Sequence, residues 1–112
     1  IIINSYILTL DRGIEELGVE LYDEIEDGEN ILYIADPPLA MHRLYTLQLT
    51  TDPGHDRNIT AYWADENINW SSILVDNQIS WVILTDDTEN YLDDRWIVFE
   101  TQTSHEVYYL AE

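Results

Sequence analysis

The stretch from Asp11 to Glu29 repeats its apolar residues with the period of an α-helix. Successive apolar positions are three, four and four residues apart, so they fall on one face of a helix: Ile14, Leu17, Leu21 and Ile25. Gly28 is a natural stop, and the pattern predicts one main amphipathic helix over about residues 12–27. Gly18 lies on the apolar side of this helix, which indicates a close approach to a neighbouring sheet.

The rest of the chain is dominated by segments typical of β-strands, either alternating or short and apolar. Asp36-Pro37-Pro38 ends one strand, Asp76-Asn77 is predicted to form a two-residue hairpin turn, and a closing hairpin is predicted around residues 101–104. Segments with one of these two patterns cover residues 3–10, 31–35, 43–50, 59–63, 71–75, 78–85, 95–100 and 105–110. The sequence therefore predicts an α+β fold, with the helix packed on a mainly antiparallel sheet of about six or seven strands.

The length of 112 residues predicts a single domain over residues 1–112 that buries its own core. Hydrophobic residues make up 46% of the chain, which excludes a disordered acidic tail. No apolar run reaches the ~18 residues of a membrane span, and the N-terminal apolar stretch lacks the features of a signal peptide. Cysteine is absent, as is typical of a cytoplasmic protein.

The charge is strongly one-sided. Twenty-three Asp and Glu residues face four arginines and no lysine, and the net charge is -19. Such a chain repels nucleic acid and anionic membranes and attracts basic partners. Direct nucleic-acid binding is excluded as a function, because phosphate contacts require Lys and Arg side chains that this chain almost lacks.

Seven carboxylates occupy about half of the predicted helix surface, with Val19 as an apolar residue among them. Several of them form like-charged pairs four residues apart, which destabilise a helix by a few tenths of a kcal/mol each. One interpretation is an ordinary solvated face, although such a face carries both signs of charge. The other is a surface that binds a basic groove. Carboxylates one turn apart are spaced by ~5–6 Å, which is of the same order as the ~3.4 Å spacing of phosphates along a DNA strand. The residues of this first acidic group are Glu15, Glu16, Glu20, Asp23, Glu24, Glu26 and Asp27.

A second acidic group follows the strand at 78–85. Its composition fits a loop with helix-capping residues, and its spacing does not match a calcium-binding loop. We interpret it as a second anionic patch, with Tyr91 as a candidate contact residue within it. Its acidic members are Asp86, Asp87, Glu89, Asp93 and Asp94.

No motif in the chain indicates catalysis. His42, His55 and His105 are scattered without metal-ligand spacing, and there is no glycine-rich phosphate loop. We therefore expect no enzyme, no catalytic residue, no cofactor and no metal. Trp81 and Trp96 are predicted to be core residues, whereas the sequence leaves open whether the tryptophans at 63 and 70 are core or contact residues.

The carboxylate layout of residues 15–27 and 86–94, together with the missing lysines, resembles DNA-mimic proteins as a functional class. These are small acidic domains, often bacterial or phage-borne, that occupy the DNA site of a basic protein. Targets of the class include nucleoid proteins such as HU, restriction enzymes, repair glycosylases and CRISPR effectors. The resemblance implies a cytoplasmic inhibitor or modulator with a basic DNA-binding protein as its partner, and we favour a monomer.

Two other functions stay open at this point. An immunity protein that neutralises a cognate toxin nuclease would use the same electrostatics, with one tight partner and an aromatic hot spot. A small-ligand module or an enzyme would instead require a deep pocket with convergent polar groups.

Overall fold

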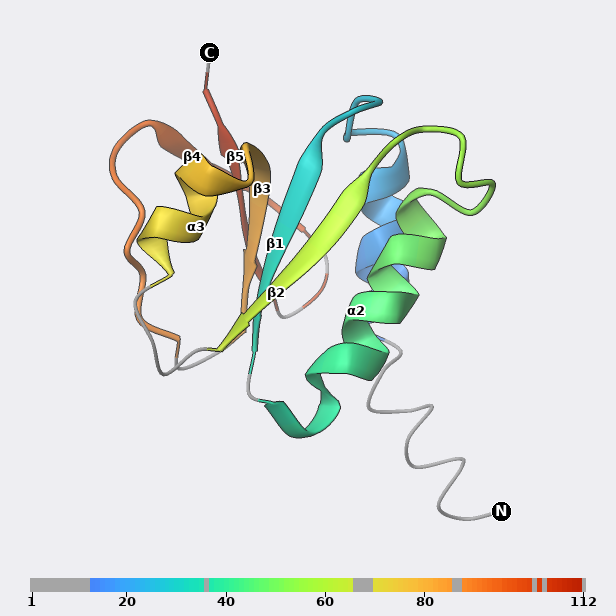
Figure 1. Cartoon of the computed structure of the whole chain (residues 1–112), viewed down its shortest axis with the longest axis horizontal. Helices are drawn as coiled ribbons and strands as arrows, with labels where there is room; N and C mark the ends of the chain where they lie inside the picture. The colour runs from blue at the N-terminus through green and yellow to red at the C-terminus, as the bar shows by residue number, and fades with distance from the viewer. Residues whose placement is uncertain are drawn as a thin grey trace.

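The computed structural model of the chain describes residues 13–35, 37–65, 70–85, 88–101, 103 and 105–111. The predicted strand at 3–10 lies outside these residues. The described part is an α+β fold, built as a central sheet with helices on both faces (Figure 1).

The sheet has five strands among the described residues, in the order β2-β1-β3-β5-β4. Strand β1 pairs in parallel with β2 and β3, whereas β5 pairs antiparallel with β3 and β4. The predicted strands at 31–35, 59–63, 78–85, 95–100 and 105–110 are confirmed, and so is the closing hairpin, formed by β4 and β5. Their bounds are β1 (Asn30–Ala35), β2 (Thr60–Asp65), β3 (Ile79–Leu84), β4 (Trp96–Phe99) and β5 (Glu106–Leu110).

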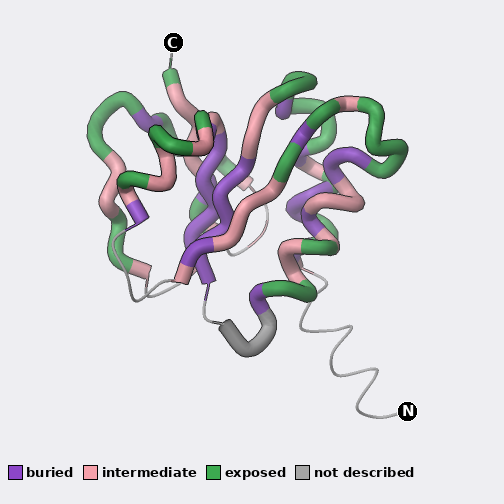
Figure 2. The backbone as a smooth tube through the Cα atoms, in the orientation of Figure 1, coloured by how far each residue is buried: buried purple, intermediate pink, exposed green. Residues whose placement is uncertain are grey.

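Three helices occur in the described part of the chain: residues 13–22, α2 (Pro37–Thr51) and α3 (Ser71–Asp76). The helix of residues 13–22 and α2 lie on one face of the sheet, and α3 lies on the other (Figure 1). Figure 2 shows the buried residues concentrated in the central strands, with further buried positions on the helix of residues 13–22 and on α2.

The two sheet faces bury two separate clusters of apolar side chains. On the first face, Leu17 and Leu21 of the N-terminal helix and Leu47 of α2 pack against alternate residues of the strands, such as Tyr33 and Ile83. On the second face, the remaining alternate residues, among them Leu32, Ile34 and Val82, pack against Trp70 and Trp96. Both faces of the central strands are thus buried, as expected for strands with parallel neighbours covered by helices.

The prediction of a strand at 43–50 is wrong, because these residues belong to α2. Pro37 and Pro38 occupy the first helical turn, where the missing N–H of proline is not needed. Along α2 the buried positions are Ala40, Leu47 and Thr51, a helical spacing. Tyr45 is 64% exposed, although the strand alternation assigned it to the apolar side.

The prediction of a strand at 71–75, with a hairpin turn at Asp76-Asn77, is also wrong. These residues form the short helix α3. Asn77 caps its C-terminal end and donates its backbone N–H to the carbonyl oxygen of Ile73 at 3.1 Å. Gln78 then takes a positive φ of 52° and leads into β3. With these two corrections the described sheet has fewer strands than the six or seven predicted.

The helix predicted over about 12–27 ends at residue 22, and residues 23–29 form turns. Its interior glycine does meet a close neighbour, but this neighbour is α2 and not the sheet. A Cβ atom built at Gly18 would lie 1.7 Å from Oγ1 of Thr50. The bare glycine backbone therefore lets the two helices pack directly against each other.

All four tryptophans are buried or half-buried. Trp81 and Trp96 are buried, which confirms the prediction. Trp70 is fully buried and makes an edge-to-face contact with Tyr91. Trp63 is half-buried, and its indole N–H donates to the carbonyl oxygen of Ala35 at 3.0 Å.

Candidate functional site

The first acidic group extends along the helix of residues 13–22 and the turns that follow it. Glu15 and Glu16 are exposed on the helix. Glu20 is half-buried, and its carboxylate accepts a hydrogen bond from the Thr101 hydroxyl at 2.6 Å. The exposed members of the group on the turns are Asp23, Glu24, Glu26 and Asp27.

The turns that carry these acids are held by local contacts. The carboxylate of Glu29 accepts the backbone N–H of Glu26 at 2.7 Å, and Gly28 takes a positive φ of 86°. The backbone N–H of Gly28 donates to the carbonyl oxygen of Arg57 at 2.8 Å. Because Gly28 alone among these residues adopts the left-handed region without strain, it allows the chain to reverse into β1.

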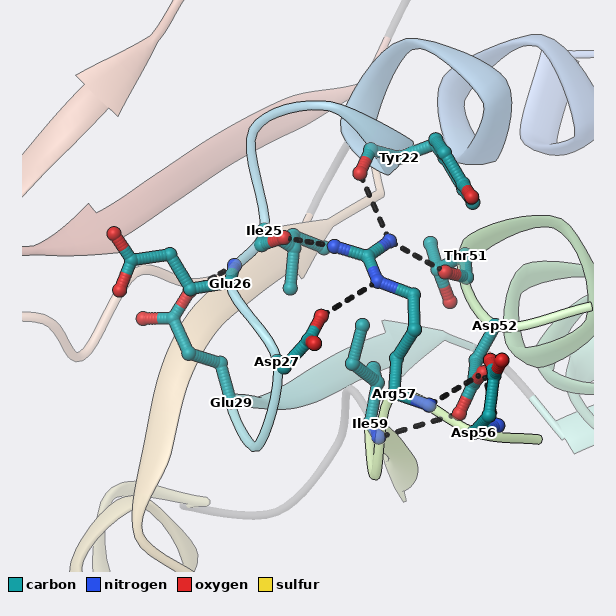
Figure 3. Close-up of polar contacts among 10 residues, drawn as sticks. All are labelled: Tyr22, Ile25, Glu26, Asp27, Glu29, Thr51, Asp52, Asp56, Arg57 and Ile59. Atoms are coloured by element: carbon teal, nitrogen blue, oxygen red, sulfur yellow. Dashed lines mark hydrogen bonds and ion pairs between the residues drawn. The ribbon is translucent and has the colours of Figure 1, made fainter. Parts of the chain in front are cut away.

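The guanidinium of Arg57 fastens the end of the N-terminal helix to the end of α2 (Figure 3). Its N–H groups donate to the carbonyl oxygens of Tyr22 and Thr51, both at 2.9 Å, and to the carbonyl oxygen of Ile25. Nε donates to the carboxylate of Asp27 at 2.9 Å. The hydrogen bond to Asp27 raises the pKa of Arg57, and the guanidinium lies 4.6 Å from the ring centroid of Tyr22.

The loop that presents Arg57 is itself held by Asp52, which is 2% exposed. One carboxylate oxygen accepts the backbone N–H groups of Asp56 and Arg57 at 3.1 Å, and the other accepts that of Ile59 at 3.4 Å. Burial alone would raise the pKa of Asp52, but these backbone hydrogen bonds lower it overall. Asp52 is therefore ionised and acts as the cap that shapes the loop.

The second acidic group lies on the other side of the molecule. Asp86 and Asp87 lie outside the described residues, whereas Glu89, Asp93 and Asp94 are exposed. Two of these have local partners. The carboxylate of Glu89 accepts the hydroxyl of Tyr91 at 3.0 Å, and this hydrogen bond raises the pKa of Tyr91.

The other local pair joins Asp93 to Arg95, with an N–O distance of 2.9 Å. The hydrogen bond from the Arg95 side chain lowers the pKa of Asp93. Both side chains are more than half exposed, so the pair contributes little to stability.

The structure keeps the two acidic groups apart. Residues 13–22 pack into the first core cluster, whereas Tyr91 and Leu92 of the second group pack into the second cluster. The sheet therefore stands between the two groups (Figure 1). They form two surfaces, and a flat partner can contact only one of them at a time.

Sequence reasoning missed the residues that position the first acidic group. Arg57 contacts Tyr22, which is 35 positions away, and no local pattern reports such a contact. Asp52 accepts hydrogen bonds from backbone groups of its own loop, and the sequence does not single it out among the many acidic residues. Among the residues searched in the described part of the chain, no group of His, Cys, Asp and Glu has the arrangement of a metal site. No helix in that part is long and apolar enough to cross a membrane.

Comparisons with known proteins add no relative to this picture. No protein-family model matches the chain, and neither the curated proteins nor the solved structures give a match.

Proposed function

We propose that the protein is a non-enzymatic DNA mimic, which binds the DNA-binding surface of a basic nucleic-acid-binding protein and competes with DNA. An HU-like nucleoid protein, a restriction or repair enzyme and a CRISPR protein are partners of the required chemistry. One observation carries the proposal: the charged side chains exposed by the helix of residues 13–22 and the turns after it are all carboxylates. We call the set Glu15, Glu16, Asp23, Glu24 and Glu26 the helix-side acidic surface.

The electrostatics of this surface favour a basic partner. Within the described part of the chain, Glu15, Asp23 and Glu24 have no ion-pair partner. Arg57 contacts these turns, and its guanidinium is already bound to three carbonyl oxygens and Asp27. The negative charge of these three carboxylates is therefore available to an incoming row of Lys and Arg side chains.

The surface also has the rigidity that mimicry requires. A phosphate-binding groove is preformed, so a mimic with mobile carboxylates would lose side-chain and loop entropy on binding. Arg57 and Asp52 (Figure 3), together with Gly28, fix the turns against α2 and β1 before any partner binds. We expect this preformed acidic surface to associate with a basic partner quickly, and the association to be driven by charge and weakened by salt.

The test is a competition experiment with labelled duplex DNA bound to an HU-like protein, followed by fluorescence anisotropy. The wild-type protein should displace the DNA. The triple variant Glu15→Lys, Asp23→Lys, Glu24→Lys should lose at least about tenfold in affinity, since close charge pairs across interfaces couple by ~1.5 kcal/mol or more. All three residues are exposed, so the fold should survive, which circular dichroism checks.

The matched control makes the same charge change on the opposite side of the sheet, at the exposed residues Glu89, Asp94 and Glu106. This control variant should compete within about threefold of the wild type, since only long-range screened attraction is reduced. Equal losses in both triple variants would contradict the assignment of the binding surface. Failure of the wild-type protein to displace DNA from any basic DNA-binding protein tested would refute the proposal.

An immunity protein against a toxin nuclease is the second candidate, and one observation favours it. Among the described strands β4 is at an edge of the sheet, and its Ile97 and Val98 are 42% and 61% exposed. An apolar edge strand suits a single dedicated partner more than a range of phosphate-binding proteins. Pull-down from lysate at low and high salt separates the two, because salt removes a charge-only mimic, whereas one tightly held nuclease stays bound.

A further inference from the structure

A cleft of about 520 Å³ opens between the turns of residues 23–29 and strands β3, β4 and β5. Its floor is aromatic. Trp81 and Tyr109 are cross-strand partners on β3 and β5, and Phe99 comes from β4. The ring centroids of Phe99 and Tyr109 each lie 5.5 Å from that of Trp81, with the Phe99 ring at 75° to the indole plane.

The other wall of the cleft is acidic. Glu24, Glu26 and Glu29 line it, and no Lys, Arg or His side chain of the described residues does. Glu29 is half-buried, and its carboxylate is fixed in place. It accepts the indole N–H of Trp81 at 3.1 Å and the backbone N–H of Glu26 at 2.7 Å.

These two walls suit one class of occupant. Aromatic faces attract organic cations, and the attraction grows when the cation is partly removed from water. Fixed carboxylates beside the rings add Coulombic attraction and exclude anions. An occupant must also cover apolar surface, as the alkyl stem of a lysine or arginine does while its charged end stays near water and carboxylates.

We propose that this cleft receives a single lysine or arginine side chain of the basic partner and thereby fixes the register of the partner on the acidic surface. The inference rests on the proposed function for the identity of the partner. Glu24 and Glu26 belong both to the helix-side acidic surface and to the cleft wall, so the anchor and the surface are continuous. The cleft supplies a specific contact that a row of exposed carboxylates lacks.

The test uses the intact protein and three blocked tripeptides, glycine–lysine–glycine and its arginine and norleucine analogues. The readout is the indole N–H resonance of Trp81 in a ¹⁵N-correlation spectrum, assigned with a Trp81→Phe variant. The lysine or the arginine peptide, or both, should move this resonance in a saturable way. The norleucine peptide has the alkyl stem without the charge and should leave the resonance unmoved.

Variants of the two walls sharpen the test. Glu29→Gln keeps an acceptor oxygen for Trp81, removes one charge and should weaken binding of the cationic peptide by about three- to tenfold. Tyr109→Leu should weaken it by a similar factor. The matched controls are Glu106→Gln on the opposite side of the sheet and Tyr45→Leu on the exposed face of α2, which should change binding less than about twofold.

The outcomes separate this inference from the proposed function. An unmoved Trp81 resonance at saturating cation, or equal losses from Glu29→Gln and Glu106→Gln, would overturn the proposed cation binding in the cleft while leaving DNA competition intact. Equal shifts with the norleucine peptide would overturn it as well. If the cleft binds the cationic peptide saturably but the protein fails to displace DNA, the cleft is confirmed as a cation site and the proposed DNA mimicry is refuted.

Discussion

At the scale of single residues, Arg57 shows how one cation can organise an acidic surface. It gathers three backbone carbonyl oxygens and one carboxylate from two chain segments (Figure 3). A planar guanidinium with several fixed N–H groups can satisfy this set, whereas the ammonium of lysine presents a compact charge without the fork geometry. The side chain is 17% exposed, so carbonyl oxygens left unpaired by a substitution would be poorly solvated.

We therefore predict that Arg57→Lys lowers the free energy of unfolding by about 2–3 kcal/mol, through hydrogen bonds lost from partly buried acceptors. Urea denaturation followed by circular dichroism measures the change. The matched control is Arg95→Lys, whose guanidinium is 67% exposed beside Asp93. That substitution should leave the free energy of unfolding unchanged within the error of the measurement. Equal effects of the two substitutions would show that Arg57 is not the anchor of the turns.

The candidate site was predictable from sequence only where its geometry is local. The helical period correctly placed Glu15 and Glu16 on the outer face, because a helix positions them by spacing alone. The half-burial of Glu20 depends on Thr101, which is 81 residues away. The aromatic floor of the cleft likewise depends on cross-strand register, which no single segment encodes.

At the scale of elements, the crossing of the N-terminal helix and α2 depends on one missing side chain. The Cβ position of Gly18 lies 1.7 Å from Oγ1 and 2.6 Å from Cβ of Thr50, so any larger residue requires the helices to separate. Thr50 also donates its hydroxyl to the carbonyl oxygen of Thr46 at 2.8 Å, which restricts its movement. Glycine is thus retained within a helix despite its low helix propensity.

We predict that Gly18→Ala lowers the free energy of unfolding by about 1–3 kcal/mol, the usual range for overpacking, although alanine favours the helix. Thermal and urea denaturation measure it. Thr50→Gly removes the atoms that would clash with a Cβ at position 18. Gly18→Ala should therefore cost less stability in the Thr50→Gly background than in the wild type. Additive effects of the two substitutions would contradict a direct contact at this crossing.

The errors in predicting the elements have one physical origin. In residues 43–50 the alternation of Tyr45, Leu47 and Leu49 is compatible with a strand, but the helical set of Ala40, Leu47 and Thr51 is the one that becomes buried. Residues 71–75 are short and apolar, a pattern shared by strands and helical turns. The parallel pairs of β1 depend on α2 and α3 as crossover connections, so missing these helices also hid the parallel half of the sheet.

At the scale of the whole molecule, the fold and the proposed binding place opposite demands on the same charge. A net charge of -19 on 112 residues repels itself more strongly in the compact state than in the expanded chain. The same charge attracts a basic partner over a distance set by the ionic strength. Salt should therefore act on folding and on binding in opposite directions.

We predict that raising NaCl from about 0.02 M to about 0.5 M increases the midpoint of thermal unfolding by about 5 °C, equivalent to ~1 kcal/mol in a domain of this size. Over the same range the affinity for a basic DNA-binding protein should fall. The triple variant Glu15→Lys, Asp23→Lys, Glu24→Lys provides the control, because salt effects unrelated to screening act equally on both proteins. Its midpoint should rise less than that of the wild type, since it carries less repulsion to screen. A midpoint that falls with salt would mean that contacts such as Arg57 with Asp27 outweigh the repulsion, and that the excess acid imposes no burden on the fold.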